Sequence, residues 1–200
     1  MLKRIKEKKE RQRKIVLSIV ISALMILSVF GILIGGFSSG ATRLTYNGHK
    51  FEQVIEQNSV FYVTKINGQK EAFLFYPADL EAIAYTPGVA SIIKGATILS
   101  LSRDAGMPAS TAQYLDLLKY DLLQRGYSVQ SASLGPNSYG WPQLSCEDST
   151  SQAPVIVAYE AQEPSIQLNG NCVVLEGNGT SMLMVHDRLL YALNGVMSDG

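Results

Sequence analysis

His186 is one of two histidines in this 200-residue chain, and an imidazole is the side chain best suited to moving a proton near neutral pH. Helical periodicity places it near the centre of an apolar stripe that faces the core. Burial disfavours the charged ring and requires hydrogen-bond partners, so His186 is either a satisfied core histidine or part of a pocket. Asp187 points about 100° away around the helix, and the two are not expected to form a catalytic pair with each other.

Ser102 and Asp104 are the next candidates for chemistry, because they end or follow a short apolar run that is typical of a buried strand. Folds of the α/β class place ligands at the carboxyl edge of such strands. A hydrolase would combine His186 with a hydroxyl such as Ser102 or Ser100, or with Asp104. In the alternative, Arg103 and Asp104 pair with each other or with solvent.

Sequence motifs that identify an enzyme are absent. The chain contains no G-x-S-x-G, H-E-x-x-H, Walker-type or G-x-G-x-x-G pattern. The loop Gly177–Thr180 precedes a helix and offers backbone N–H groups to an anion, but it lacks the Lys that would make such a site specific, so we interpret it as a turn. No cofactor is expected, and a non-catalytic role is favoured over an enzyme.

Cys146 and Cys172 are the only cysteines of the chain. In an oxidising exterior, an even pair in a small domain indicates a disulfide rather than two free thiols. Their spacing is not CxxC, and a metal site would have to recruit His49 or His186 from a distance. We therefore expect a disulfide and no metal site.

Two loops carry residues that can face a partner or a modifying enzyme. Tyr139 and Trp141 lie in a loop rich in Gly and Pro, where aromatic side chains either anchor a binding surface or pack as a lid beside the disulfide. Asn178 begins an N-x-T sequon, which is a possible glycosylation site. The same three residues also suit a loop that starts a helix.

The fold that must position these residues is predicted to be of the mixed α/β (α+β) class. Asn-Gly pairs at 47–48 and 67–68 predict hairpins, the second of them between two convincing strands, and so indicate a β-meander at the start of the domain. Residues 96–134 predict a strand, a helix and a strand, the pattern of a right-handed parallel βαβ unit. Ser110 is the expected N-cap of that helix, and Gly126 its end.

The segments 155–176 and 180–196 complete the predicted domain. The first contains a buried strand and then a strand pair around Asn169-Gly170, while 135–153 is an irregular excursion rich in Gly, Pro, Asn and Ser. The second is an amphipathic helix that begins at Thr180 and carries His186.

Charge and hydropathy divide the chain into segments 1–14, 15–36, 37–44 and 45–200. Residues 1–14 hold eight Lys or Arg and two Glu, whereas residues 15–36 hold no charge. As a helix, 15–36 spans about 33 Å, the thickness of a bilayer core, so it is predicted to be an uncleaved transmembrane signal anchor followed by a tether at 37–44. The positive-inside rule places 1–14 in the cytoplasm and the domain at 45–200 outside, in a single-pass protein of the cell membrane.

The predicted partners follow from the same division. The lipid bilayer surrounds the span, and the basic tail orients the chain and contacts anionic head groups, while a nucleic-acid arm is the alternative. Small residues at 38–41 leave cleavage of the anchor open. Residues 37–200 hold nine basic and fifteen acidic residues, which excludes a nucleic-acid binder whose folded part is basic.

Several stretches carry a resemblance to a known group: YNGHKFEQV, FLFYPADLEAI, CEDSTSQAPVIVAYEA and NCVVLEGNGTSMLMVHDRLLYALNGVM, together with the basic tail and the span. The chain resembles uncharacterised single-span envelope proteins of archaea with small genomes. The resemblance implies an anchored domain outside the cell and the cysteine pair. It implies no activity and no catalytic residues.

The sequence thus favours a membrane-anchored extracytoplasmic domain with a non-catalytic binding or structural role at the cell envelope, where it binds another envelope protein or a surface component. The first alternative is a membrane-tethered hydrolase that uses His186 with a Ser or Asp. The second is an accessory subunit of a membrane assembly, for which a GxxxG pattern at Gly31 to Gly35 would provide a helix-packing face.

Overall fold

The computed structural model describes residues 42–56 and 59–199. The predicted cytoplasmic tail at 1–14, the predicted span at 15–36 and most of the tether at 37–44 lie outside the described residues. In the part that is described, no helix is both long and apolar enough to cross a membrane. The described residues form a mixed α/β fold with two sheets and three α-helices.

The domain begins with an antiparallel four-stranded sheet, here called the meander, in which each strand pairs with the next along the chain. Asn47 and Gly48 have φ angles of 46° and 81°, and Asn67 and Gly68 have φ angles of 51° and 84°. Such left-handed pairs form the tight turns that match the twist of a hairpin, so both predicted hairpins are confirmed. Its strands are β1 (Arg43–Tyr46), β2 (His49–Glu56), β3 (Ser59–Ile66) and β4 (Gln69–Phe73).

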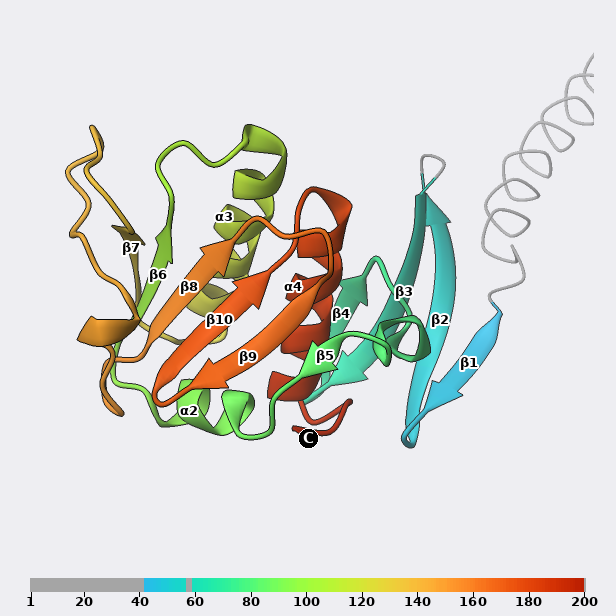
Figure 1. The fold of residues 1–200 in the computed structure, drawn as a ribbon. Helices are drawn as coiled ribbons and strands as arrows, with labels where there is room; N and C mark the ends of the chain where they lie inside the picture. Colours follow the sequence, from blue (N-terminus) through green and yellow to red (C-terminus); the bar gives the residue numbers. More distant parts are fainter. Residues whose placement is uncertain (1–41, 57–58, 200) are drawn as a thin grey trace, which may run out of the picture. The chain divides into compact units, whose positions relative to one another are not determined.

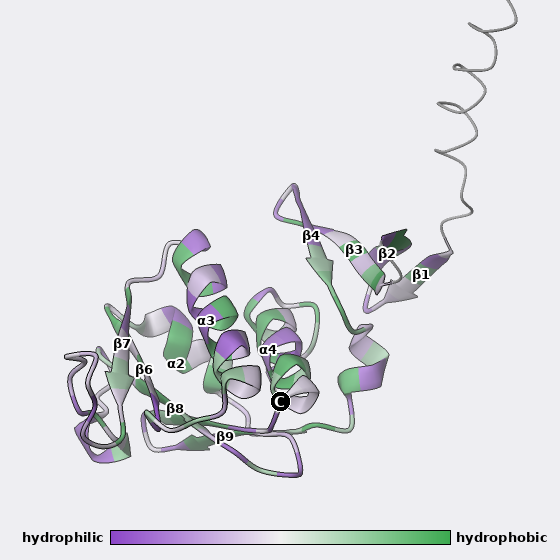
Figure 2. Cartoon of the chain, turned by 90° about the horizontal axis from the view of Figure 1, so that it is seen from above, coloured by the Kyte–Doolittle hydropathy of each residue, from purple (hydrophilic) through white to green (hydrophobic). Residues whose placement is uncertain are grey.

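A six-stranded sheet of order β5-β9-β10-β8-β6-β7 forms the rest of the domain, with α2, α3 and α4 on one of its faces (Figures 1 and 2). Strands β7, β6, β8 and β10 are mutually parallel, while β9 is antiparallel to β10 and parallel to β5. The elements are the short 3-10 helices η1 (Pro77–Leu80) and η2 (Cys146–Asp148), the helices α2 (Val89–Gly95), α3 (Ala109–Gln124) and α4 (Thr180–Leu193), and the strands β5 (Ala84–Tyr85), β6 (Leu99–Arg103), β7 (Val129–Ser133), β8 (Val155–Tyr159), β9 (Ser165–Asn169) and β10 (Cys172–Glu176).

The predicted βαβ unit is confirmed as β6, α3 and β7, but the predicted N-cap of its helix is wrong. Helix α3 begins at Ala109, and the capping position is held by Pro108, whose carbonyl accepts from the N–H groups of Thr111 and Ala112. The ring of Pro108 fixes its φ at −53° and so sets the entry to the helix without a side-chain cap. Ser110 lies inside the first turn, and the helix ends before Gly126, whose φ is 87°.

Helix α4 lies between the six-stranded sheet and the meander (Figure 2). It begins at Thr180, as predicted, but it is buried on almost every side, including the polar residues His186, Asp187 and Arg188. The meander covers the side that an amphipathic surface helix would expose to water. The meander packs on α4 through an aromatic side chain: the rings of Phe73 and Tyr191 are stacked with centroids 4.1 Å apart.

The tail after α4 closes one end of the helix layer. Asp199 accepts hydrogen bonds from the N–H of Ala90 at 2.8 Å and from the N–H and hydroxyl of Ser91 at 3.3 and 3.0 Å, and so caps the start of α2. The hydroxyl of Tyr85 donates to the same carboxylate at 2.8 Å. Burial raises the pKa of Asp199, but these hydrogen bonds outweigh it and hold the pKa below its ordinary value.

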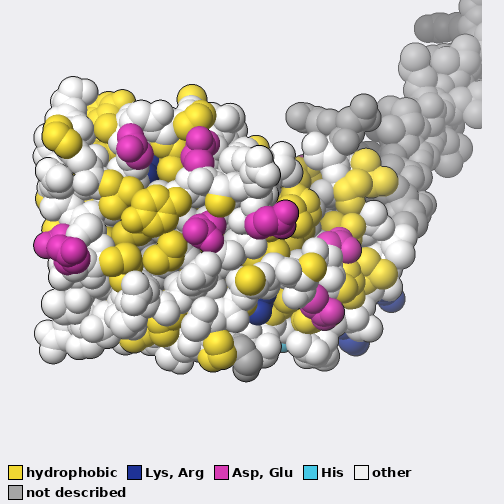
Figure 3. Space-filling model, in the orientation of Figure 1, with side chains coloured by type: hydrophobic (Ala, Val, Ile, Leu, Met, Phe, Trp, Pro, Cys, Tyr) yellow, Lys and Arg dark blue, Asp and Glu magenta, His cyan; other side chains and the backbone are white. Residues whose placement is uncertain are grey.

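The other face of the six-stranded sheet carries a smaller apolar cluster. Val155, Val157 and Cys172 are buried there beneath Leu134 and Leu144, which belong to the excursion between β7 and β8. A disulfide joins Cys146 to Cys172, as predicted, and fastens the excursion to β10. Figure 3 shows hydrophobic side chains gathered over this face of the sheet.

Candidate functional site

His186 lies between two carboxylates. Its Nδ1 is 2.8 Å from Oδ1 of Asp187, and its Nε2 is 2.8 Å from Oδ2 of Asp121 on α3. Carboxylate oxygens accept hydrogen bonds, so this geometry favours the imidazolium form of the ring, in which both nitrogens donate. Burial of the ring lowers its pKa, but the hydrogen bonds and charges of Asp121 and Asp187 outweigh burial and raise the pKa above its ordinary value.

The hydrogen bond between His186 and Asp187 shows that their side chains meet, although the helical angle predicts that they point apart. The helical angle fixes the direction of the Cα–Cβ bond only, and rotation about the side-chain bonds brings Oδ1 of Asp187 back to the ring. Its other oxygen, Oδ2, accepts from the N–H groups of Leu74 and Phe75 at 2.9 and 3.0 Å. Those donors follow directly after β4, so Asp187 fastens the meander to α4.

A hollow of about 230 Å³ lies beside His186, and its charged groups are paired with one another. Arg125 forms an ion pair with Glu71, and it also lies 3.9 Å from Asp121, four residues earlier in the chain. Asn194 donates to Glu71 at 3.3 Å. His186 is thus a core histidine that also borders a hollow, and the lining of that hollow contains no hydroxyl, thiol or amine nucleophile.

Ser102 lies on the opposite face of the six-stranded sheet from His186. Side chains of a strand alternate between faces, and Leu99 and Leu101 of β6 point into the core beneath the helices. The hydroxyl of Ser102, which is fully buried, therefore points the other way and donates to the carbonyl of Leu144 at 2.6 Å. Ser100 shares that orientation and accepts from Gln130 at 2.9 Å.

Asp104 lies at the carboxyl edge of the parallel strands, where a hollow of about 380 Å³ is present. It accepts from the N–H of Gly106 at 2.6 Å and shares the hollow with Glu160, which accepts from Thr111 at 2.9 Å. Arg103 does not pair with Asp104; it forms an ion pair with Asp116 at 3.3 Å. The hollow lies at the carboxyl edge of the strands, where the sequence analysis expects a ligand. Its lining has no histidine that could act with these carboxylates.

The predicted binding loop has one exposed aromatic residue and one half-buried one. The rings of Tyr139 and Trp141 stack with centroids 4.7 Å apart, and the guanidinium carbon of Arg103 lies 5.4 Å from the Trp141 ring. The side chain of Asn137 bonds to the backbone of both aromatic residues and rigidifies the loop. Tyr139 is 62% exposed and is the part of the loop that can meet a partner.

The sequon residue Asn178 is exposed in the turn before α4. Its N–H donates to the hydroxyl of Ser181 at 2.7 Å, and its carbonyl accepts from the same hydroxyl at 2.9 Å. These bonds satisfy backbone groups at the start of the helix, as expected of a loop that starts a helix. Glycosylation of Asn178 stays a prediction.

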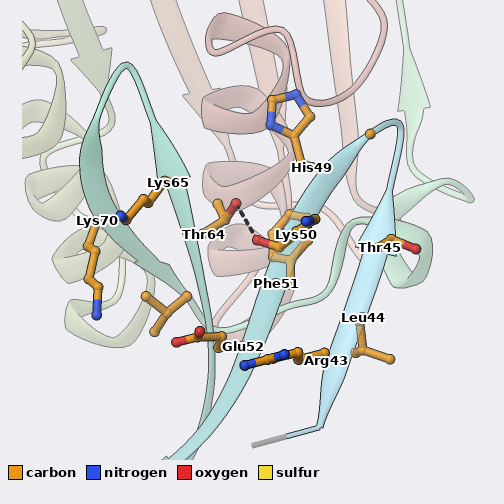
Figure 4. A pocket seen from close by; sticks show the side chains of 12 residues that line it. Arg43, Leu44, Thr45, His49, Lys50, Phe51, Glu52, Thr64, Lys65 and Lys70 are labelled. Atoms are coloured by element: carbon orange, nitrogen blue, oxygen red, sulfur yellow. Dashed lines mark hydrogen bonds between the residues drawn. The ribbon is translucent and has the colours of Figure 1, made fainter.

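Two surface features were missed by the reasoning from sequence. The larger is a groove of about 680 Å³ on the outer face of the meander, lined by Arg43, Lys50, Lys65 and Lys70 (Figure 4). A signal for it exists, since Lys65 and Lys70 flank the predicted hairpin turn Asn67-Gly68 at positions that a two-residue loop pairs.

The second missed feature is an apolar stripe on the solvent side of α3. Leu117, Tyr120 and Leu123 are 39%, 58% and 44% exposed, and their spacing of three residues keeps them on one side of the helix. The buried side of α3 is formed by other residues, Leu115, Leu118 and Leu122. The stripe is visible in the sequence as a second apolar face, which the first, stronger face conceals.

No group of three or more His, Cys, Asp or Glu side chains within residues 42–56 and 59–199 is placed to hold a metal ion. Comparisons of the chain with protein-family models, with curated proteins and with solved structures found no match. The resemblance to archaeal envelope proteins stays a prediction.

Proposed function

We propose that residues 45–200 form a non-catalytic module that is held at the outer face of the cell membrane by the segment 15–36 and binds a protein of the envelope. The anchored topology rests on the division of charge along the sequence. The disulfide supports it, because such bonds persist in oxidising compartments.

The stripe of Leu117, Tyr120 and Leu123 on α3 is the observation that carries the binding role. These residues make up three of the seven large hydrophobic side chains that the described residues expose. They add nothing to the core, which α3 reaches with its opposite side, and exposed apolar surface favours association. Leucine and tyrosine at this spacing suit a partner with its own apolar groove or helix.

The binding role is tested by placing a photoreactive amino acid at position 120 of the full chain in intact cells. We expect a crosslinked product of defined mass from position 120 and none from position 55. Ile55 is the matched control, since it is 72% exposed but lies on β2, away from the stripe. Equal products from both positions would mean that exposed apolar residues react without a specific partner.

A second test addresses the same surface by mutation. The substitutions L117Q, Y120Q and L123Q in one chain should abolish the crosslink from a probe at Asp116, while the melting temperature stays within a few degrees because these side chains are exposed. The substitution I55Q should leave the crosslink unchanged. Retention of the product in the triple variant would refute the assignment of the stripe.

The topology is tested separately by proteolysis of intact cells. With the domain outside, protease digests residues 45–200 without lysis, whereas residues 1–14 stay protected. Protection of the domain until lysis would overturn the proposed location.

The alternative functions have less support. A hydrolase would need His186 next to Ser102 or Asp104, and these three residues lie apart in the fold. An accessory role in a membrane assembly rests on Gly31 and Gly35, which lie outside the described residues.

A further inference from the structure

Three lysines, here called the lysine row, lie side by side on the outer face of the meander. Lys65 and Lys70 are direct cross-strand partners on β3 and β4, and Lys50 lies one residue before Phe51, the partner of Thr64, so it neighbours Lys65 on β2. Phe51 and Thr64 are buried, so the lysines that alternate with them point outward, and all three are exposed. Figure 4 shows their side chains along one groove.

Without a ligand, the lysine row lowers the stability of the folded domain. Like charges directly opposite each other on paired strands destabilise a sheet. Neither the lysines of the row nor Arg43, which lines the same groove, forms an ion pair with any described acidic side chain. Glu52 is the one acidic residue in the lining. An anionic ligand would relieve the repulsion that the fold leaves uncompensated.

The charge of the surrounding domain makes the groove distinctive. Residues 37–200 carry nine basic and fifteen acidic residues, and four of the nine line the groove. Outside it, four of the five remaining basic residues bind protein partners: Arg103, Lys119, Arg125 and Arg188. The six-stranded sheet presents mainly acidic charges in Figure 3. An anionic surface would therefore attract the groove and repel the rest of the domain.

The chain itself brings such a surface within reach. Arg43 is the first residue of β1, and the predicted span ends at residue 36. The six residues 37–42 reach at most about 21 Å when fully extended. The meander is therefore held close enough to touch the head groups, and cationic side chains that come within a Debye length of an anionic leaflet, about 10 Å, gain from its phosphates. We propose that the outer face of the meander docks onto anionic phospholipid head groups, with the lysine row against their phosphates.

Docking fixes the orientation of the domain on the membrane and turns its acidic face away from the bilayer. It rests on the anchored topology proposed above, but it does not depend on a partner for α3, which is a different surface.

The test is lysine acetylation of the full chain in lipid nanodiscs, read residue by residue by mass spectrometry. With phosphatidylglycerol in the discs, we expect Lys50, Lys65 and Lys70 to react about fivefold more slowly than in discs of phosphatidylcholine, the factor that one lysine contact with an anionic leaflet supplies. Lys94 is exposed on α2 and serves as the internal control, with equal rates in both discs. High salt should remove the difference, because it screens the contact.

A variant gives a second readout. The substitutions K50Q, K65Q and K70Q in one chain should leave the melting temperature unchanged or raise it, since they remove repulsion between exposed groups. In anionic discs the wild-type meander should exchange its amide hydrogens more slowly than in neutral discs, and the variant should lose that difference while K94Q keeps it. If the triple variant fails to fold, the acetylation rates of the wild-type chain still test whether the meander docks onto anionic head groups.

Three outcomes would overturn the proposal. Equal lysine reactivity in both kinds of disc would show that the head groups do not contact the row. Protection by soluble polyglutamate in neutral discs, without protection in anionic discs, would assign the groove to an acidic polypeptide instead. Failure of the chain to enter either disc would remove the anchor on which docking rests, whereas loss of the crosslink from position 120 alone would contradict only the binding role of α3.

Discussion

The charged form of His186 is favoured inside the domain, because each of its ring nitrogens lies 2.8 Å from a carboxylate oxygen. The contribution of this pairing to stability depends on the proton that the ring carries. Its pKa is raised in the folded chain, so over the range between the ordinary histidine pKa and the raised value the folded state binds more protons than the unfolded state. The stability that His186 gains from its two carboxylates is therefore fully present below the ordinary histidine pKa, and it is lost as pH rises through the pKa of the folded state.

We expect the free energy of unfolding to fall as pH rises from about 6 through this window. Urea unfolding in detergent, followed by the fluorescence of Trp141, measures the slope. The substitution H186Q should flatten it, and H49Q should leave it as in the wild type, since His49 is not part of this cluster. An H186Q variant with the wild-type slope would contradict the assignment.

Asp199 gives the opposite dependence on pH. Its pKa is lowered in the fold, so its contribution is complete above the ordinary Asp pKa and is lost as pH falls through the lower, folded value. The substitution D199N should lower the free energy of unfolding by about 1 kcal/mol at neutral pH, because it weakens the cap of α2. Chemical denaturation checks this, with E163Q at an exposed position as control; equal stability of the two variants would show that the cap is dispensable.

Among the elements, the excursion between β7 and β8 depends most on a single bond. The disulfide closes a loop with a sequence separation of 26 residues, and removing it should lower the free energy of unfolding by about 3 kcal/mol in the chain-entropy description. The variant C146A/C172A should also show faster hydrogen exchange in residues 135–153 than in β6, because β6 is held by strands on both sides. Unchanged exchange in the excursion would mean that Leu134 and Leu144 hold it without the bond.

The elements that sequence reasoning predicted well are those specified by neighbouring residues. Asn47-Gly48, Asn67-Gly68 and the strand–helix–strand of 96–134 carry their own turn and periodicity signals. The burial of α4 was missed because it depends on the meander, more than a hundred residues earlier in the chain. The hydrogen bonds that Leu74 and Phe75 donate to Asp187 belong to the same long-range packing, and so does the separation of Ser102 from His186 by the sheet.

On the scale of the whole domain, α4 couples the two sheets. Removing the carboxylate of Asp187 leaves His186 with one partner and two backbone N–H groups of the segment after β4 with none. We expect D187A to lower the free energy of unfolding by about 3 kcal/mol, the typical effect of breaking a buried ion pair. Hydrogen exchange should quicken in the meander before it does in β8 and β10.

The matched control for D187A is D104A, at an exposed carboxylate that accepts one local bond. Its stability should stay close to that of the wild type. If hydrogen exchange in D187A quickens equally in all strands, Asp187 is not what couples the sheets. The aromatic contacts of Tyr191 with the meander would then be the main coupling.

The position of α4 in the chain sets the order of events during biosynthesis. Phe73 leaves the ribosome long before Tyr191, on which its ring packs. If the domain is translocated across the membrane after its anchor, the meander crosses first. Its apolar face stays exposed until the end of α4, residue 193, has also crossed. The contact between the meander and α4 then forms late, and in that interval a chaperone that shields nascent strands would protect the chain from aggregation.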